Sequence, residues 1–206
     1  MSHTAEEVEK VKHAPATPGV IEPILARWSP RAFSHRPVSH EDLKTIFEAA
    51  RWAASSYNEQ PWRFLVGHRG DPTYQKIFDS LVEFNQGWAK SAPVLILSAA
   101  QKHFARSGAP NHFAIHDTGA ATAYLVLQAT VLGLHAHSMA GFDQEKARAA
   151  FGIPVDFAIG AVTALGHLGD AETLPEGLRE QDLSPRQRKP LSEFVFAGWG
   201  EAARLE

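Results

Sequence analysis

Residues 48–66 read EAARWAASSYNEQPWRFLV, and this stretch joins a helix to a strand through a polar turn. The helix is predicted to begin after Ser39, because serine is a good N-cap and apolar residues recur at helical spacing over residues 43–50. Residues 62–66 alternate in the manner of a strand. The polar residues 55–61 between them interrupt both patterns, so the sequence predicts a helix-to-strand connection at this point.

Further elements extend outward from this connection. Residues 1–19 are predicted to form a loose leader or a short helix, and the final pair, Leu205-Glu206, is assigned no role. Helices are expected after Asp71-Pro72, over residues 113–133 and after Asp143, and strands over residues 93–99, 135–140 and 157–166. Interleaved helices and strands without a phosphate-loop or Rossmann glycine fingerprint predict a single α+β domain over residues 1–206. Its expected form is a three-layer α-β-α sandwich with a mixed central sheet.

The composition excludes several kinds of chemistry. The chain has 206 residues, 44% of them apolar, and no cysteine, so disulfides, thiolate nucleophiles and cysteine-ligated metals are excluded. A formal net charge of -3 argues against nucleic acid as a partner. The first residues lack an apolar run, so no signal peptide is predicted and the cytoplasm is the expected compartment. No G-x-S-x-G motif is present, which disfavours a serine hydrolase.

The helix predicted over residues 113–133 is apolar on nearly every face. A membrane span is one interpretation, but His116, Asp117 and Gln128 interrupt the run and no basic flank follows. We therefore expect no membrane association, and we expect this helix to be buried on all sides at the centre of a dimer.

Four polar segments are candidates for a binding site. Arg27, Ser29 and Arg31 alternate, so an extended backbone would place two guanidinium groups and a hydroxyl together, as a phosphate requires. A solvated basic loop is the alternative. Residues 55–60 offer neutral donors and acceptors suited to a ring system, or form a plain turn. Residues 138–143 could expose backbone N–H groups, or form a tight turn. Residues 186–190 are a cationic patch or an exposed linker.

Two histidine pairs have spacings at which both side chains could bind one metal ion. His112 and His116 are four residues apart on a predicted helix, and His135 and His137 share one face of a predicted strand. Eleven histidines make chance pairs common, and no HExxH motif is present, so no metal site is predicted.

Taken in this order, the four segments resemble the nitroreductase family of FMN-dependent oxidoreductases. The resemblance runs from about Ile24 to Gly200 and is carried by RWSPRAF, AASSYNEQPW, DTGAATAYLVLQATVLGL, SMAGFD and RQRKPLSEFV. It implies a domain-swapped homodimer with FMN at the subunit interface and a C-terminal arm, about residues 184–206, packed on the partner. NADH or NADPH would donate hydride to flavin N5, and a nitroaromatic or a quinone would accept it.

The resemblance also implies roles for individual residues. Arg27, Ser29 and Arg31 would contact the phosphate, the ribityl chain or the pyrimidine edge, with Arg31 as the candidate for stabilising reduced flavin. Ser55, Ser56 and Asn58 would approach from the other subunit, while Arg186 and Arg188 complete the phosphate clamp. The implied cofactor-binding set is Arg27, Trp28, Ser29, Arg31, Ser55, Ser56, Asn58, Gln60, Asn85, Ser138, Met139, Ala140, Gly141, Arg186 and Arg188.

This chain departs from the family pattern at three positions. Ala54 stands where many relatives have proline, Trp88 where some have lysine, and Ala140 where an acidic residue is common. Four alternatives remain: a reductive dehalogenase, a flavin-fragmenting enzyme, a flavin-binding protein without turnover, and a purely structural dimer.

Overall fold

The computed structural model describes residues 4–205, so the first three residues of the predicted leader and Glu206 lie outside it. The helices are α1 (Ala5–Lys12), α2 (Glu22–Ala26), α3 (His40–Arg51), α4 (Pro72–Ser80), α5 (Glu83–Ala89), α6 (Ala114–Val131), α7 (Gln144–Phe151) and α8 (Glu176–Leu183), with short 3-10 turns η1 (Ser56–Asn58), η2 (Ala171–Thr173) and η3 (Leu191–Glu193). The strands are β1 (Trp62–His68), β2 (Val94–Gln101), β3 (His135–Met139), β4 (Phe157–Gly166), β5 (Phe196–Gly198) and β6 (Glu201–Ala202).

The expected helix caps are confirmed. Ser39 accepts a hydrogen bond from the Asp42 backbone N–H at the start of α3, and Asp71 accepts one from Tyr74 at the start of α4. Each cap satisfies a backbone donor that has no partner within its helix. The leader contains a short helix, α1, which begins with a capping box at Thr4.

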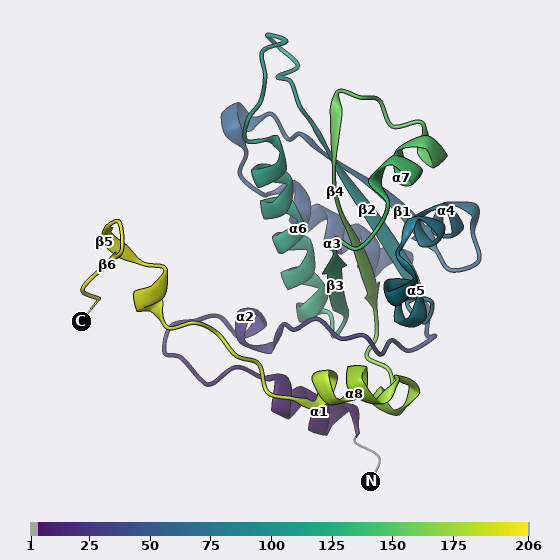
Figure 1. Ribbon diagram of the computed structural model, residues 1–206, viewed down its shortest axis with the longest axis vertical. Helices are drawn as coiled ribbons and strands as arrows, with labels where there is room; N and C mark the ends of the chain where they lie inside the picture. Colours follow the sequence, from purple (N-terminus) through teal and green to yellow (C-terminus); the bar gives the residue numbers. More distant parts are fainter. Residues whose placement is uncertain (1–3, 206) are drawn as a thin grey trace.

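The central sheet has the strand order β1-β2-β4-β3 (Figure 1). All three of its pairings are antiparallel, so the expectation of a mixed sheet is wrong for the described strands, whereas the α+β class is confirmed. The reason is the position of β4. Strands β2 and β3, which precede and follow α6 in the chain, run in the same direction and would form a parallel pair if they were neighbours. Strand β4 lies between them and runs the opposite way.

Helices cover both faces of this sheet and make three layers (Figure 1). Alternate residues of β2 point to opposite faces. Leu95 and Leu97 belong to the core under α4, α5 and α7, whereas Val94 and Ile96 belong to the core under α3 and α6. All four side chains are at most 2% exposed, so each contributes about 1.5–3 kcal/mol through burial.

Helix α6 is buried on one side only. Ala121, Leu125 and Ala129 pack into the core, but Ile115 and Tyr124 remain 49% and 46% exposed. One chain alone therefore does not bury this helix on all sides. Within residues 4–205, no helix combines the length and hydropathy needed to cross a bilayer. Cover of the exposed apolar side by a second copy stays a prediction.

The first helix, α1, and the last helix, α8, lie side by side near one end of the sheet (Figure 1). The C-terminal segment then passes α2 and extends away from the body (Figure 1). Its hairpin of β5 and β6 leaves Trp199 99% exposed and Phe194 57% exposed. An arm with apolar side chains in solvent fits the predicted packing on a partner, which a single chain does not test.

Candidate functional site

Arg27 and Ser29 lie together after α2, whereas Arg31 has a different partner. The Arg27 guanidinium donates to the Ser29 hydroxyl at 3.3 Å. Arg31 donates through its backbone N–H to one Asp182 carboxylate oxygen at 2.7 Å and through its guanidinium to the other at 3.2 Å. The Asp182 carboxylate therefore balances the charge of Arg31, while Arg27 keeps its charge uncompensated. Trp28 between them is buried against the ring of His135.

The C-terminal segment brings two more arginines to Arg27. The Arg186 guanidinium donates to the backbone carbonyls of Leu25 and Arg27 at the end of α2. Arg27, Arg186 and Arg188 then line a cavity of 540 Å³, whose other lining residues are Ala14, Pro15, Ile24 and Leu25. None of these lining residues is acidic. The cavity gathers three positive charges from segments about 160 residues apart.

The electrostatics of this cavity favour an anion. Burial lowers the pKa of Arg27, and the positive charge of Arg188 lowers it further. Burial likewise lowers the pKa of Arg186, with additional repulsion from Arg27 and Arg188. The Arg186 Nε is buried and has no hydrogen-bond partner. An anion in the cavity would relieve the repulsion between like charges and satisfy this donor.

Two residues of this site were not found from the sequence. Asp182 is 2% exposed and holds the Arg31 segment, and Lys12 is 6% exposed beneath Trp28. The partners of Asp182 lie about 150 residues away in the chain. Both residues occur in charged, helical-looking stretches that resemble ordinary surface helices, so no local signal distinguished them.

The turn over residues 55–60 has an unusual backbone. Tyr57, Asn58 and Gln60 all have positive φ, at 52°, 57° and 53°. Such conformations are costly for residues other than glycine and concentrate at functional sites. Ser55 stabilises the turn, since its hydroxyl accepts from the Gln60 backbone N–H at 3.0 Å.

Asp117 anchors the same turn from α6. Its carboxylate is buried and accepts a hydrogen bond from the Ser56 backbone N–H at 2.9 Å. His116 contacts the other carboxylate oxygen at 3.1 Å. Asp117 therefore fixes the start of the polar turn from α6.

The cavity lined by Arg27, Arg186 and Arg188 is called the arginine cavity below. It and the turn over residues 55–60 lie at opposite ends of the sheet. Trp62, directly after the turn, pairs with Ala100, which pairs with Ala158 near the start of β4. The arginine segment reaches β3 through the Pro30 carbonyl, which contacts His137, the partner of Ala164. Six residues of β4 separate these positions, or ~20 Å at the rise of an extended strand. One chain does not bring the two sets together.

The segment after β3 is held by Asn85. The Asn85 side-chain amide donates to the Gly141 carbonyl at 2.9 Å, and its oxygen accepts from Trp88 at 3.3 Å. Met139 is buried and Ala140 is exposed, so the backbone near Ala140 lies at the surface. A Cβ at Gly141 would lie 2.5 Å from the Asn85 side-chain nitrogen, so a larger residue here would displace the Asn85 amide. Ser138 bonds to the Thr163 hydroxyl at 2.8 Å instead of facing this segment.

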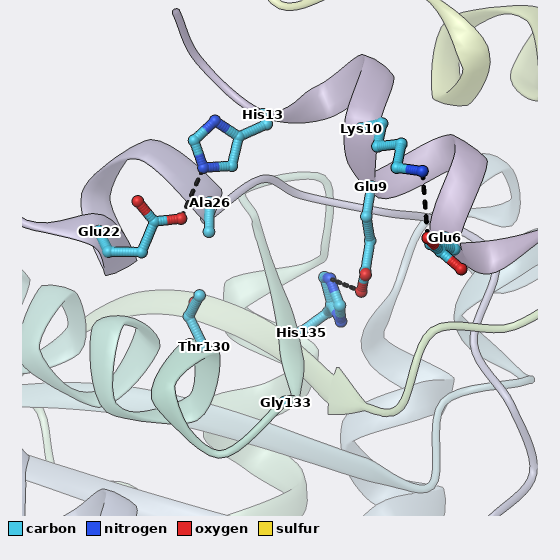
Figure 2. Close-up of a pocket in the computed structure, with 9 residues that line it drawn as sticks. All are labelled: Glu6, Glu9, Lys10, His13, Glu22, Ala26, Thr130, Gly133 and His135. Carbon is cyan, nitrogen blue, oxygen red and sulfur yellow. Dashed lines mark hydrogen bonds and ion pairs between the residues drawn. The ribbon is translucent and has the colours of Figure 1, made fainter. Parts of the chain in front are cut away.

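A second cavity, of 490 Å³, lies between α1, α2 and the end of α6 (Figure 2). Its lining includes Glu6, Glu9 and Glu22, so it is unsuited to phosphate. His135 faces Glu9 at 3.7 Å, and burial lowers the pKa of this histidine to about 4. No cluster of three or more histidine, aspartate or glutamate side chains among residues 4–205 is arranged to hold a metal ion.

Comparisons with known proteins agree with this fold. The model of the nitroreductase family matches residues 24–81 and 68–167. A crystal structure of an oxidoreductase containing FMN is 38% identical, with a TM-score of 0.84 over 90% of this chain and 94% of that chain. A Desulfovibrio desulfuricans protein solved in complex with FMN is 25% identical, with a TM-score of 0.70 over 89% and 98% of the two chains. An NADH dehydrogenase of Thermus thermophilus is 30% identical over 203 residues, covering 84% of this chain and 92% of the relative.

Fold and cavity together describe a three-layer α+β protein with a cationic cavity at one end of its sheet. The family match covers more than half of the chain and includes α3, the polar turn and the whole central sheet. The chain belongs to the nitroreductase family.

Proposed function

We propose that this chain is an FMN-dependent NAD(P)H oxidoreductase that works as a homodimer. The observation that carries the proposal is the cavity lined by Arg27, Arg186 and Arg188 without an acidic residue. The similar oxidoreductase containing FMN and the similar NADH dehydrogenase support the choice of cofactor and of electron donor.

The residues of the cavity fit the phosphate of FMN. Three guanidinium groups provide more than enough charge for a phosphate dianion, and planar guanidinium groups match its oxygens well. The buried Arg186 Nε supplies a donor that has no hydrogen-bond partner among residues 4–205. The Ser29 hydroxyl lies beside Arg27 and can contact the phosphate or the adjoining ribityl chain.

The second part of the binding site comes from another subunit in this proposal. Ser55, Ser56, Asn58 and Gln60 lie ~20 Å along the sheet from the arginine segment, by the rise of an extended strand. A two-fold dimer that covers the exposed apolar side of α6 would place the turn of one copy near the arginines of the other. The exposed side chains of the C-terminal arm favour the same arrangement.

When bound, FMN supplies the hydride acceptor and donor, so no nucleophile of the protein is needed. The protein's residues bind and orient the ring system. Arg31 follows Arg27 by four residues in the chain. Its buried Nε has no hydrogen-bond partner among the described residues. We assign to this N–H the stabilisation of negative charge on the pyrimidine edge, with Asp182 fixing the orientation of the guanidinium. The surface backbone near Ala140, positioned by Asn85, would lie along the ring edge.

The direct test uses the purified full-length protein. We expect a yellow protein that releases FMN on denaturation, sediments as a dimer, and oxidises NADH or NADPH when a nitroaromatic or a quinone is supplied. A colourless protein that fails to bind added FMN would overturn the proposal. Bound FMN without oxidation of either nicotinamide would leave a flavin-binding protein and refute the enzymatic part.

A further inference from the structure

Lys12 is a buried ammonium group whose hydrogen bonds go to backbone carbonyls. Its side chain belongs to α1, outside the residues matched by the family model. The Nζ donates to the carbonyls of Gln181 and Ser184, each at 2.6 Å, and lies 5.0 Å from the centre of the Trp28 ring. Lysine is almost never buried without a reason, because desolvation of its charge is costly. Burial indeed lowers the pKa of Lys12.

The contacts of Lys12 join the two segments that carry the arginines. Gln181 and Ser184 form the end of α8, where unpaired carbonyls and the helix dipole favour a cation. Arg186 follows two residues after Ser184. Trp28, on the other side of Lys12, directly follows Arg27. The Lys12 side chain therefore contacts both segments that carry the arginines of the cavity: the end of α8 just before Arg186, and Trp28 just after Arg27.

The end of α2 also bonds to both the N-terminal segment and the C-terminal segment. The Leu25 carbonyl accepts from the Ala14 backbone N–H at 3.0 Å and also from the Arg186 guanidinium. The leader, α2 and the C-terminal segment thus meet in one cluster of bonds, with α1 lying beside α8 (Figure 1). Arg27, Arg186 and Arg188 repel one another, so this cluster must hold them together whenever no anion is bound.

We propose that Lys12 is a positioning residue that keeps Arg186 and Arg188 beside Arg27, and so sets the preference of the cavity for a flavin that carries a phosphate. The inference rests on the proposed function, and it assigns a role in cofactor selection to the N-terminal helix. Lys12 does not itself contact the phosphate in this scheme, because both carbonyls and the Trp28 ring occupy its ammonium group.

The experiment compares FMN with riboflavin, the same ring system without phosphate. Flavin affinity is measured by fluorescence quenching on full-length protein for wild type and for Lys12→Met, which keeps the apolar stem against Trp28. We expect about tenfold weaker FMN binding and less than about twofold change for riboflavin, as the loss of two charge-assisted bonds to the arginine segment would give. Lys12→Arg, which can donate to both carbonyls, should restore most of the FMN preference.

Lys10→Met is the matched control. Lys10 is on the same helix, but it is exposed and pairs with Glu6 at 3.1 Å. Its replacement should leave both affinities unchanged. Equal losses for FMN and riboflavin in Lys12→Met, or no loss for FMN, would overturn the inference. If Lys12→Met does not fold, the ratio of FMN affinity to riboflavin affinity is measured on Lys12→Gln instead. This variant keeps a neutral amide donor, and it should also lose affinity for FMN more than for riboflavin. Failure of wild type to bind FMN would instead refute the proposed function.

Discussion

The arginine cavity and the polar turn over residues 55–60 are built in opposite ways. The cavity is assembled from three segments: the chain after α1, the chain from α2 to Arg27, and the C-terminal segment. Hydrogen bonds that involve Lys12, Asp182 and Arg186 hold these segments together. The turn is held mainly by bonds that span a few residues, and from elsewhere it is reached by Asp117 and by the Ala105 backbone N–H, which donates to the Glu59 carboxylate at 2.8 Å. The difference teaches that charge is gathered here by tertiary contacts, whereas the neutral donors are positioned by backbone conformation.

Removal of charge from the cavity should have the largest effect. In Arg27→Ala with Arg188→Ala, two charge-assisted contacts to phosphate are lost. We expect FMN binding to weaken by about 3–4 kcal/mol, two to three orders of magnitude. Titration of flavin fluorescence measures the change. Lys189→Ala is the control, because Lys189 is in the same basic stretch but pairs with Glu193. Unchanged affinity in the double variant would mean that the phosphate binds elsewhere.

The same contrast explains which features the sequence could predict. The caps at Ser39 and Asp71 and the alternation over residues 62–66 are local patterns, and the helices and strand they predict are present. The sheet pairing depends on β4 lying between β2 and β3, which no local pattern encodes. Likewise Arg31 was identified as a site residue, but its partner Asp182 lies 151 residues away. Sequence spacing says nothing about such a pair.

Loss of the Asp182 carboxylate should destabilise the cavity end of the fold. Asp182→Ala leaves Arg31 and two backbone donors without their acceptor. Breaking a buried ion pair costs about 3–5 kcal/mol, and the partial exposure of Arg31 reduces our expectation to about 2–3 kcal/mol. Urea unfolding of the apoprotein measures it. Glu180→Ala, an exposed change on the same helix, should stay within about 0.5 kcal/mol of wild type. A loss no larger than that control's would contradict the assigned role of Asp182.

Loss of the anchor at the other end should cost less. Asp117→Ala removes the acceptor of the Ser56 backbone N–H, while the local bonds of the turn remain. We expect a loss of about 1–2 kcal/mol in the free energy of unfolding, the cost of leaving one buried donor unsatisfied. Asp79→Ala is the comparison, because Asp79 is exposed and its carboxylate accepts a bond from Gln75 on the same helix, while the bond from Lys146 goes to its backbone carbonyl and is kept in the variant. If Asp117→Ala costs as much as Asp182→Ala, the turn is not held mainly by local bonds.

The smallest effect should come from the strained backbone of the turn itself. Tyr57 is 93% exposed and has a φ of 52°, so Tyr57→Gly relieves a conformation that costs about 1 kcal/mol. The greater freedom of glycine in the unfolded chain offsets part of this gain, which leaves a stabilisation of about 0.5 kcal/mol. Glu59→Gly, in the same turn but at a φ of -68°, should instead destabilise by at least about 1 kcal/mol, because glycine adds freedom to the unfolded chain and the bond from the Ala105 N–H to the Glu59 carboxylate is lost. Urea unfolding of both variants measures whether the free energy of unfolding rises for Tyr57→Gly and falls for Glu59→Gly. A destabilised Tyr57→Gly would show that side-chain contacts of Tyr57, such as its ring contact with Phe104, outweigh the backbone in holding the turn.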